Sequence, residues 1–157
     1  MIARAAAALL AAALAACQPT NGNATMVDRS PAGLEQVPLT ITTGNGKMHR
    51  FTVEVARTPE QQAQGLMNRQ SLAPDRGMIF PYDEPVMTSF WMKNTLIPLD
   101  MIFIRADGTI ARIEANTVPL SLESAASGEP VGAVLELAGG RSAELGIGPG
   151  ARVEWPR

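Results

Sequence analysis

Polar residues set among apolar ones, between Phe90 and Asp100, are the side chains of this sequence best suited to chemistry. The segment reads Phe-Trp-Met-Lys-Asn-Thr-Leu-Ile-Pro-Leu-Asp, and the apolar run Met-Ile-Phe-Ile follows it. In an extended segment alternate residues share a face, so Trp91 and Lys93 are expected to lie side by side. An indole beside an ammonium can contact a ligand through its ring face and through the charge. The structural alternative is a core tryptophan with Lys93 reaching past it to water.

Three further charges adjoin apolar segments: Arg69, Asp100 and Glu136. Partial burial would make pairing of such charges almost obligatory. One interpretation is a shared cluster that binds a small anionic or polyhydroxylated molecule. The other is an ion-pair network that fixes the register of the strands. The candidate ligand-binding residues are therefore Arg69, Trp91, Lys93, Asn94, Asp100 and Glu136.

An enzyme is the main alternative to a binding protein. Asp100 and Glu136 are two carboxylates that would serve as acid and base in a hydrolase acting on carbohydrates. A Ser-His-Asp enzyme would have to use His49, the only histidine, which lies in a predicted hairpin, and the chain lacks a Gly-x-Ser-x-Gly motif. The glycines between 139 and 150 do not follow phosphate-loop or dinucleotide spacing. We assign no catalytic residue and favour binding.

A periplasmic copper-binding protein is the second alternative, suggested by 8 methionines. Thioethers are soft ligands for Cu(I), and a Met/His/Trp site would draw on Met48, His49, Met87, Trp91 and Met92. Methionine is, however, also a common core filler. The spacing lacks the close Met-x-x-Met clusters of a dedicated copper sequence, so we expect neither a metal nor another cofactor.

The first 16 residues are typical of a lipoprotein signal peptide. Arg4 precedes an Ala/Leu run that is shorter than the roughly 20 residues of a membrane span. Small residues then lead to Cys17, as signal peptidase requires. Cys17 is expected to carry the lipid (palmitate) anchor. By resemblance to Gram-negative lipoproteins, Gln18 in place of aspartate favours the outer membrane, with the domain on the periplasmic side.

Composition and charge narrow the classes of protein to which this chain could belong. Cys17 is the only cysteine, so export implies no disulfide framework here. The formal net charge is −2 without a Lys/Arg cluster, which argues against a nucleic-acid surface. Residues 17–36 are rich in Pro, Asn, Gly and Ser and are expected to form a flexible tether. Residues 37–157 are enough for one domain with its own core.

Local patterns predict a mainly β domain of the β-rich α+β class. Alternating apolar residues at 39–43 and 51–55 flank Gly-Asn-Gly-Lys and predict a hairpin. Thr58, Pro59 and Gln61 form a capping box with proline at the first helical position, which predicts a helix over 59–69. Further strands are predicted at 77–80, 87–94, 99–105, 109–114, 131–137 and 151–155, and a brief helical turn within 139–146.

Short strands, hairpin turns and one good helix favour a compact antiparallel sheet or a partly open barrel. Asp107-Gly108 marks a tight turn between two of the paired strands.

Four segments carry a resemblance to a known family. They are Gly65-Leu66-Met67-Asn68-Arg69, Gly77-Met78-Ile79-Phe80, the hexapeptide Phe-Trp-Met-Lys-Asn-Thr followed by Ile97-Pro98-Leu99-Asp100, and Leu135-Glu136-Leu137 before Gly139-Gly140. In order and spacing they resemble the domain of unknown function 192 family, from about Leu39 to Trp155. The hexapeptide is the most specific of the four. The resemblance implies a compact, mostly β, often exported domain with no established activity. Gly148-Pro149-Gly150-Ala151 replaces the family's frequent Gly-Asp pair and affects only a turn.

Overall fold

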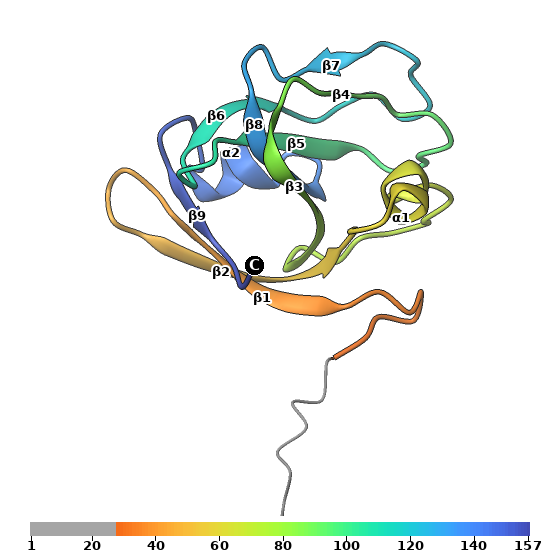
Figure 1. Ribbon diagram of the computed structural model, residues 1–157, viewed down its shortest axis with the longest axis horizontal. Helices are drawn as coiled ribbons and strands as arrows, with labels where there is room; N and C mark the ends of the chain where they lie inside the picture. Colours follow the sequence, from red (N-terminus) through yellow and green to blue (C-terminus); the bar gives the residue numbers. More distant parts are fainter. Residues whose placement is uncertain (1–27) are drawn as a thin grey trace, which may run out of the picture.

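A computed structural model describes residues 28–157, which form a curled, half-barrel sheet with a smaller layer against its outer face (Figure 1). The predicted signal peptide and lipidation at Cys17 lie outside the described residues. In chain order the elements are β1 Gln36–Thr42, β2 Met48–Val55, α1 Pro59–Gln64, β3 Arg76–Val86, β4 Ser89–Phe90, β5 Leu99–Ile104, β6 Ile110–Glu114, β7 Ala125–Ala126, β8 Val131–Ala138, α2 Arg141–Leu145 and β9 Arg152–Glu154. Neither helix of this part has the length and apolar character needed to cross a membrane.

The main sheet has seven strands in the order β6-β5-β8-β3-β2-β1-β9. All neighbours are antiparallel except β2 and β3, which are parallel because α1 and its following loop connect them. The two edge strands approach each other: the amide of Val153 donates to the Gly108 carbonyl, and Thr109 and Arg152 form a β-bridge. The predicted mainly β fold is confirmed, and the sheet is close to the partly open barrel among its alternatives.

The curl divides the apolar residues into two layers. The inner layer holds Ile41, Val53, Ile110 and Leu135, which come from strands at both ends of the sheet. The outer layer includes Met78, Phe80, Met92, Met101 and Val134 and is covered by the loop after α1 and by the small β4–β7 sheet. Because successive residues of a strand point to opposite faces, β5 and β8 contribute to both layers.

The helix α1 begins as predicted but ends five residues early. The Thr58 side chain accepts a hydrogen bond from the Gln61 amide, and the Gln61 side chain accepts one from the Thr58 amide, so the capping box is confirmed. The helix was expected to reach Arg69. Gly65 instead has φ 47° and ψ −135°, a conformation that suits glycine and ends the helix at Gln64.

Two strands also differ from the sequence prediction. β3 does not stop at Pro81 but continues to Val86, since the pairing with β8 shifts register between these residues and no longer needs the missing amide hydrogen. The strand predicted over 87–94 shrinks to β4, because the chain turns where the Thr95 amide donates to the Met92 carbonyl. The hairpin of β5 and β6 and the helical turn α2 are confirmed.

The folded part begins before Val37. Arg29 and Glu35 form a β-bridge, and the buried Ser30 hydroxyl donates a hydrogen bond to the Glu54 carboxylate. Residues 28–35, which composition assigned to the tether, therefore pack against the domain.

Candidate functional site

A cavity of about 470 Å³ lies between α1, the end of β3 and the segment 88–95. Four of the six candidate residues line it: Trp91, Lys93, Asn94 and Glu136. They come from the hexapeptide segment and from β8, which are some 40 residues apart in sequence. The structure therefore gathers most of the predicted residues at one place.

The hexapeptide has both buried side chains beneath the cavity and exposed side chains at its rim. Met92 is 2% exposed and packs in the outer layer, whereas Trp91 is 51% exposed. The Lys93 ammonium nitrogen lies 5.1 Å from the centroid of the Trp91 ring. The expected neighbourhood of Trp91 and Lys93 is confirmed, and the alternative of a core tryptophan is wrong. The turn at Met92 leaves both side chains at the surface.

Two asparagines join the walls of the cavity. Asn68 and Asn94 have φ values of 62° and 54°, the left-handed region that asparagine tolerates better than most residues. The Asn68 amide donates a hydrogen bond of 2.8 Å to the Asn94 carbonyl. This bond ties the loop after α1 to the hexapeptide and fixes the spacing of the two walls.

Glu136 is a buried carboxyl at the base of the cavity. It lies in β8 opposite Met78 of β3 and Met101 of β5, so its side chain shares the outer face with theirs. Glu136 is 5% exposed, and no side chain of residues 28–157 pairs with its carboxyl. Burial raises the pKa of Glu136 from 4.5 to about 8. At neutral pH the carboxyl is therefore mostly protonated in the empty cavity.

Aromatic rings make up much of the remaining lining, from Phe80, Tyr82, Phe90 and Trp91. The rings of Phe80 and Phe90 meet edge to face, with centroids 5.0 Å apart. The Tyr82 hydroxyl lies 3.2 Å from the Thr88 hydroxyl, and burial raises the pKa of Tyr82, with a smaller contribution from the Glu136 charge. Such a site offers aromatic side chains, one ionisable carboxyl at its base and one ammonium at its rim.

Sequence reasoning did not select Phe80, Tyr82 and Phe90. A signal for two of them exists, because Phe80 and Tyr82 are two residues apart and share a face of any strand that includes both. Because the strand was predicted over 77–80 only, Tyr82 lay outside it and that relation was missed.

Arg69 lies apart from this cavity. Its guanidinium binds the Glu54 carboxylate through two hydrogen bonds of 3.0 and 2.8 Å. Ser30 donates to the same carboxylate. The expected cluster of Arg69 with Asp100 and Glu136 is therefore not formed, because Glu54, which the sequence analysis did not consider, is the partner of Arg69.

Asp100 is fully buried and bonded to the backbone. One carboxylate oxygen accepts hydrogen bonds of 2.8 Å from the amides of Asn116 and Gly140, and the other accepts one of 2.7 Å from Ser142. Gly140 is the N-cap of α2 and has no side chain to cap it, so Asp100 of β5 takes that role. Its acceptor sites are used within the fold.

Asp100 and Glu136 do not form an acid–base pair. Across β5 and β8, Asp100 is opposite Leu137 and Met101 is opposite Glu136. The two carboxylates are therefore offset by one residue and point to opposite faces of the sheet. The hydrolase alternative required both to face one cleft, and that geometry is excluded.

The positions of the methionines and His49 also give no support to the copper alternative. Met48 and His49 begin β2 beside the hairpin turn, on the side of the molecule away from β4 (Figure 1). Met92 is buried, and its sulfur accepts a hydrogen bond of 3.0 Å from the Thr117 hydroxyl. Within residues 28–157 no three His, Cys, Asp or Glu side chains are grouped as a metal site.

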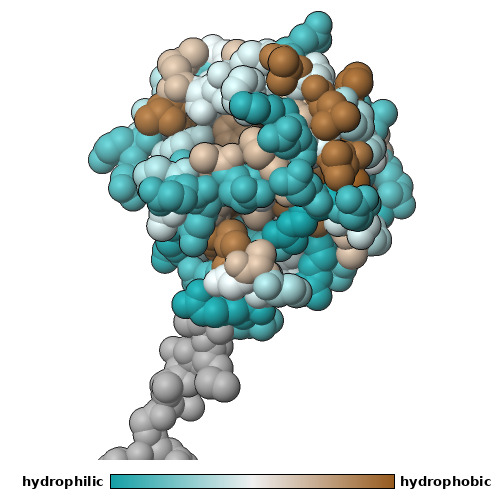
Figure 2. Space-filling model, turned by 90° about the vertical axis from the view of Figure 1, so that its right-hand side faces the viewer, coloured by the Kyte–Doolittle hydropathy of each residue, from teal (hydrophilic) through white to brown (hydrophobic). Residues whose placement is uncertain are grey.

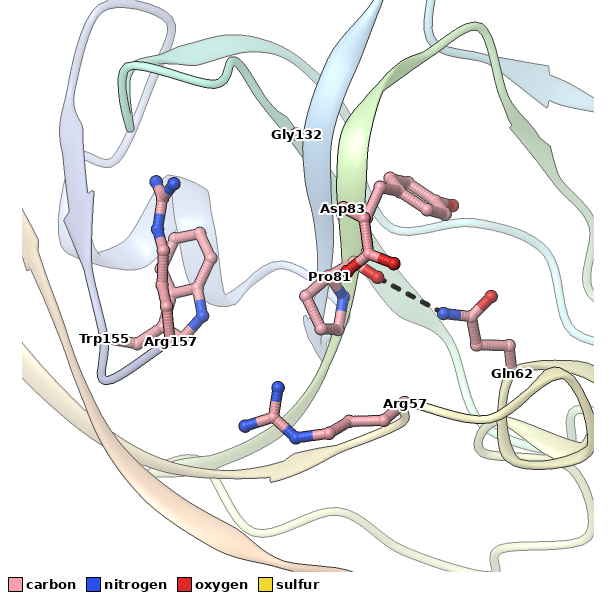
Figure 3. Close-up of a pocket in the computed structure, with 8 residues that line it drawn as sticks. Arg57, Gln62, Pro81, Asp83, Gly132, Trp155 and Arg157 are labelled. Atoms are coloured by element: carbon pink, nitrogen blue, oxygen red, sulfur yellow. Dashed lines mark hydrogen bonds between the residues drawn. The ribbon is translucent and has the colours of Figure 1, made fainter.

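A second cavity, of about 440 Å³, opens between the end of β2, β3 and the C-terminal residues (Figure 3). It contains none of the six predicted residues. Its guanidinium groups already have partners: Arg57 pairs with Glu35 at 3.1 Å, and Arg157 donates to the Ala106 carbonyl. Gln62 spans part of the opening by donating to the Pro81 carbonyl at 3.3 Å. Asp83 also lines this cavity and forms no ion pair within residues 28–157, so the cavity has a free carboxylate but no free ammonium like that of Lys93 in the first.

Exposed apolar side chains gather on the face that Figure 2 presents. The segment 118–122 runs beside the hexapeptide, because the amides of Met92 and Leu120 donate to the carbonyls of Ser121 and Thr95. Its exposed members Val118, Leu120 and Leu122 are 70%, 57% and 68% accessible.

Comparison with known proteins adds a family and solved structures. Residues 40–155 match the model of the family DUF192, described as an uncharacterised conserved family. Among solved structures, a protein of unknown function from Novosphingobium aromaticivorans DSM 12444 is 46% identical, with a TM-score of 0.79 over 85% of this chain and 95% of that one. A protein from Sinorhizobium meliloti 1021, described as a candidate transcription regulator, is also 46% identical, with a TM-score of 0.76 over 78% and 95% of the two chains. No curated protein matches the chain.

The three site variants Asp100→Ala, Lys93→Ala and Trp91→Ala should differ sharply in stability. Asp100→Ala leaves three backbone amides, at least that of Ser142 buried, without their acceptor, and each unsatisfied buried group costs about 1–3 kcal/mol, so a loss of about 3 kcal/mol is expected. Lys93→Ala and Trp91→Ala remove exposed side chains and should cost less than about 1 kcal/mol each. Urea melts measure all three, and a large loss for Lys93→Ala would assign Lys93 to the scaffold.

Glu136→Gln should change how stability depends on pH. The unfolded chain releases this proton near pH 4.5 and the folded one near pH 8, so the contribution of Glu136 is complete below 4.5 and is lost as pH rises to 8. The full loss is about 5 kcal/mol from the difference in pKa. Glutamine does not ionise, so the variant should gain stability relative to the parent across this range. Denaturant melts between pH 5 and 8.5 measure the difference, and parallel profiles for the two proteins would contradict the assignment.

Proposed function

We propose that this chain, which belongs to the uncharacterised DUF192 family, is a membrane-anchored lipoprotein of the bacterial cell envelope whose domain binds a small polar or anionic molecule. The observation that carries the proposal is the cavity of about 470 Å³ with Trp91, Lys93 and Asn94 at its rim and Glu136 at its base. Cys17, after its signal peptide, would hold the domain at the periplasmic face of the outer membrane.

The exposure of the rim residues supports binding over a structural role. A tryptophan that is 51% exposed loses much of the burial that would stabilise the fold, and its exposed ring is accessible to a ligand. Lys93 lies at the same rim without a carboxylate partner in residues 28–157 and can attract an anionic group. The apolar walls lower the local dielectric and strengthen that attraction.

Binding to nucleic acid, which the description of the S. meliloti protein would suggest, has less support here. The net charge is −2, and most arginines of the described part pair with a carboxylate. The paired arginines are Arg57, Arg69, Arg76, Arg105, Arg112, Arg141 and Arg152. Guanidinium groups that are neutralised in this way contribute little to a phosphate-binding surface.

Replacing Cys17 by serine tests the anchor. Because serine cannot carry the thioether-linked lipid, the Cys17→Ser protein should leave the membrane fraction of cells that express the full chain, whereas the parent remains in it. Separation of inner and outer membranes then locates the parent. A Cys17→Ser protein that stays in the membrane fraction would rule out acylation as the anchor.

A ligand screen tests the cavity. Sugars, nucleotides, peptidoglycan fragments, amino acids and small carboxylates are tested for a rise in the melting temperature of the domain. Trp91→Ala and Lys93→Ala should each weaken a hit by about five- to thirtyfold, since a lost stacking or charge contact is worth about 1–2 kcal/mol. Arg157→Ala, in the second cavity, is the matched control and should leave binding unchanged. Hits that are insensitive to both rim variants, or none at all, would refute the site.

A further inference from the structure

The carboxyl of Glu136 is the one polar group of the cavity whose burial has no explanation within the fold. It sits between Leu135 and Leu137 in a strand where apolar residues would pack without cost. A buried carboxyl without a partner favours its neutral form and weakens the fold whenever it ionises. A chain that needed only packing here would be more stable with a residue that cannot ionise.

A second carboxyl on the same sheet face shows what a structural role requires. Across β2, β3 and β8, Glu54, Met78 and Glu136 lie in one row, so the Cα atoms of the two glutamates are about 10 Å apart, two strand spacings. Glu54 receives a two-pronged guanidinium from Arg69 and a hydroxyl from Ser30. Glu136 is similarly buried and lies in the same row, but it has no such cation within residues 28–157. Glu54 has the Arg69 guanidinium beside it, whereas Glu136 has the cavity.

The walls around Glu136 suit a cation. The cavity has four aromatic rings, and the faces of such rings attract ammonium groups. Besides Glu136, the titratable groups that line the cavity are Tyr82, whose pKa is raised by burial, and Lys93 at the rim. The elements that flank Glu136 in the sheet present Met78 and Met101. A cation at the base would therefore meet one carboxylate among aromatic side chains.

The Lys93 ammonium sets a second requirement for the charge of the ligand. An ammonium at the rim repels a ligand that is only cationic, and it attracts one that also carries an anionic group. A ligand with both charges satisfies the base and the rim together.

We infer that the cavity binds a zwitterionic amino compound of amino-acid type, whose ammonium is held by the Glu136 carboxylate and whose anionic group is held by Lys93. The inference rests on the proposed binding function and specifies its ligand class. Phenylalanine is a suitable probe, because its ring can pack on the aromatic walls.

Three matched probes separate the two charges: phenylalanine, N-acetylphenylalanine, which lacks the ammonium, and phenylalanine amide, which lacks the carboxylate. Isothermal titration calorimetry should show binding of phenylalanine at millimolar concentration or below. Each of the other two probes should bind at least about tenfold more weakly, because a charged hydrogen-bonding partner is left unmatched.

Proton release gives a readout that a merely structural Glu136 would not produce. An ammonium binds the ionised carboxylate, so the bound protein must give up the proton of Glu136. With a pKa of about 8, that is about 0.9 proton per ligand at pH 7, measured by titration in buffers of different ionisation enthalpy. Glu136→Gln should lose both the proton release and the preference for phenylalanine over its N-acetyl derivative.

The matched control is Glu54→Gln, a carboxyl on the same sheet face that lies outside the cavity. This variant should bind phenylalanine and release the proton as the parent does. If N-acetylphenylalanine binds as tightly as phenylalanine without proton release, the ligand-class inference is overturned while an anion-binding site stands. If phenylalanine does not bind at millimolar concentration, the inference is overturned whatever the wider screen finds. The number of protons that the parent protein releases on binding phenylalanine tests the inference even if Glu136→Gln fails to fold.

Discussion

The packing of β5, α2 and the segment after β6 depends on the hydrogen bonds of the Asp100 carboxylate. This carboxylate accepts three backbone hydrogen bonds, from Asn116, Gly140 and Ser142, without exposure to solvent. These amides belong to the segment after β6 and to the start of α2, so one side chain of β5 holds three parts of the chain together. The glycines beside it allow this approach: a Cβ on Gly139 would lie 2.8 Å from the side chains of Pro98 and Asn116. A charge that is this well solvated by amides has no need of a cation.

Asp100 and Glu136 show how an offset of one residue in register places two similar carboxyls in different surroundings. They lie on neighbouring strands, and both are flanked by apolar residues. The offset of one position sends Asp100 to the inner face, where amides converge on it, and Glu136 to the outer face, where a cavity meets it. A carboxyl on the inner face therefore holds parts of the fold together, whereas a carboxyl on the outer face has no partner.

The cavity itself depends on loops that the backbone holds in place. The bond between Asn68 and Asn94 joins two turns in the left-handed region, and Gly65 ends α1 early enough for the chain to reach them. Met92 and Thr95 are buried beneath the rim, and Trp91, Lys93 and Asn94 remain above it. The hexapeptide is thus a turn in which Met92 and Thr95 anchor the segment and the exposed residues stand at the rim of the cavity.

The sequence by itself determined the elements whose signals are local. The capping box at Thr58, the hairpins around Gly44–Lys47 and Asp107-Gly108, and the apolar strands β5 and β8 follow from neighbours within a few residues. The proximity of Trp91 and Lys93 followed from the same short range. Local signals misplaced the ends of α1, β3 and β4, because a glycine at positive φ, a register shift and a turn decide those ends.

Only the tertiary structure decided what each buried charge does. Arg69 meets Glu54, Asp100 meets three amides, and Glu136 meets none of these, although all three candidates look alike beside their apolar neighbours in the sequence. The partner of a buried charge is set by strand order and register, which bring residues 15 to 42 positions apart into contact. A one-residue change in that register would exchange the faces of the sheet, and no local pattern records it.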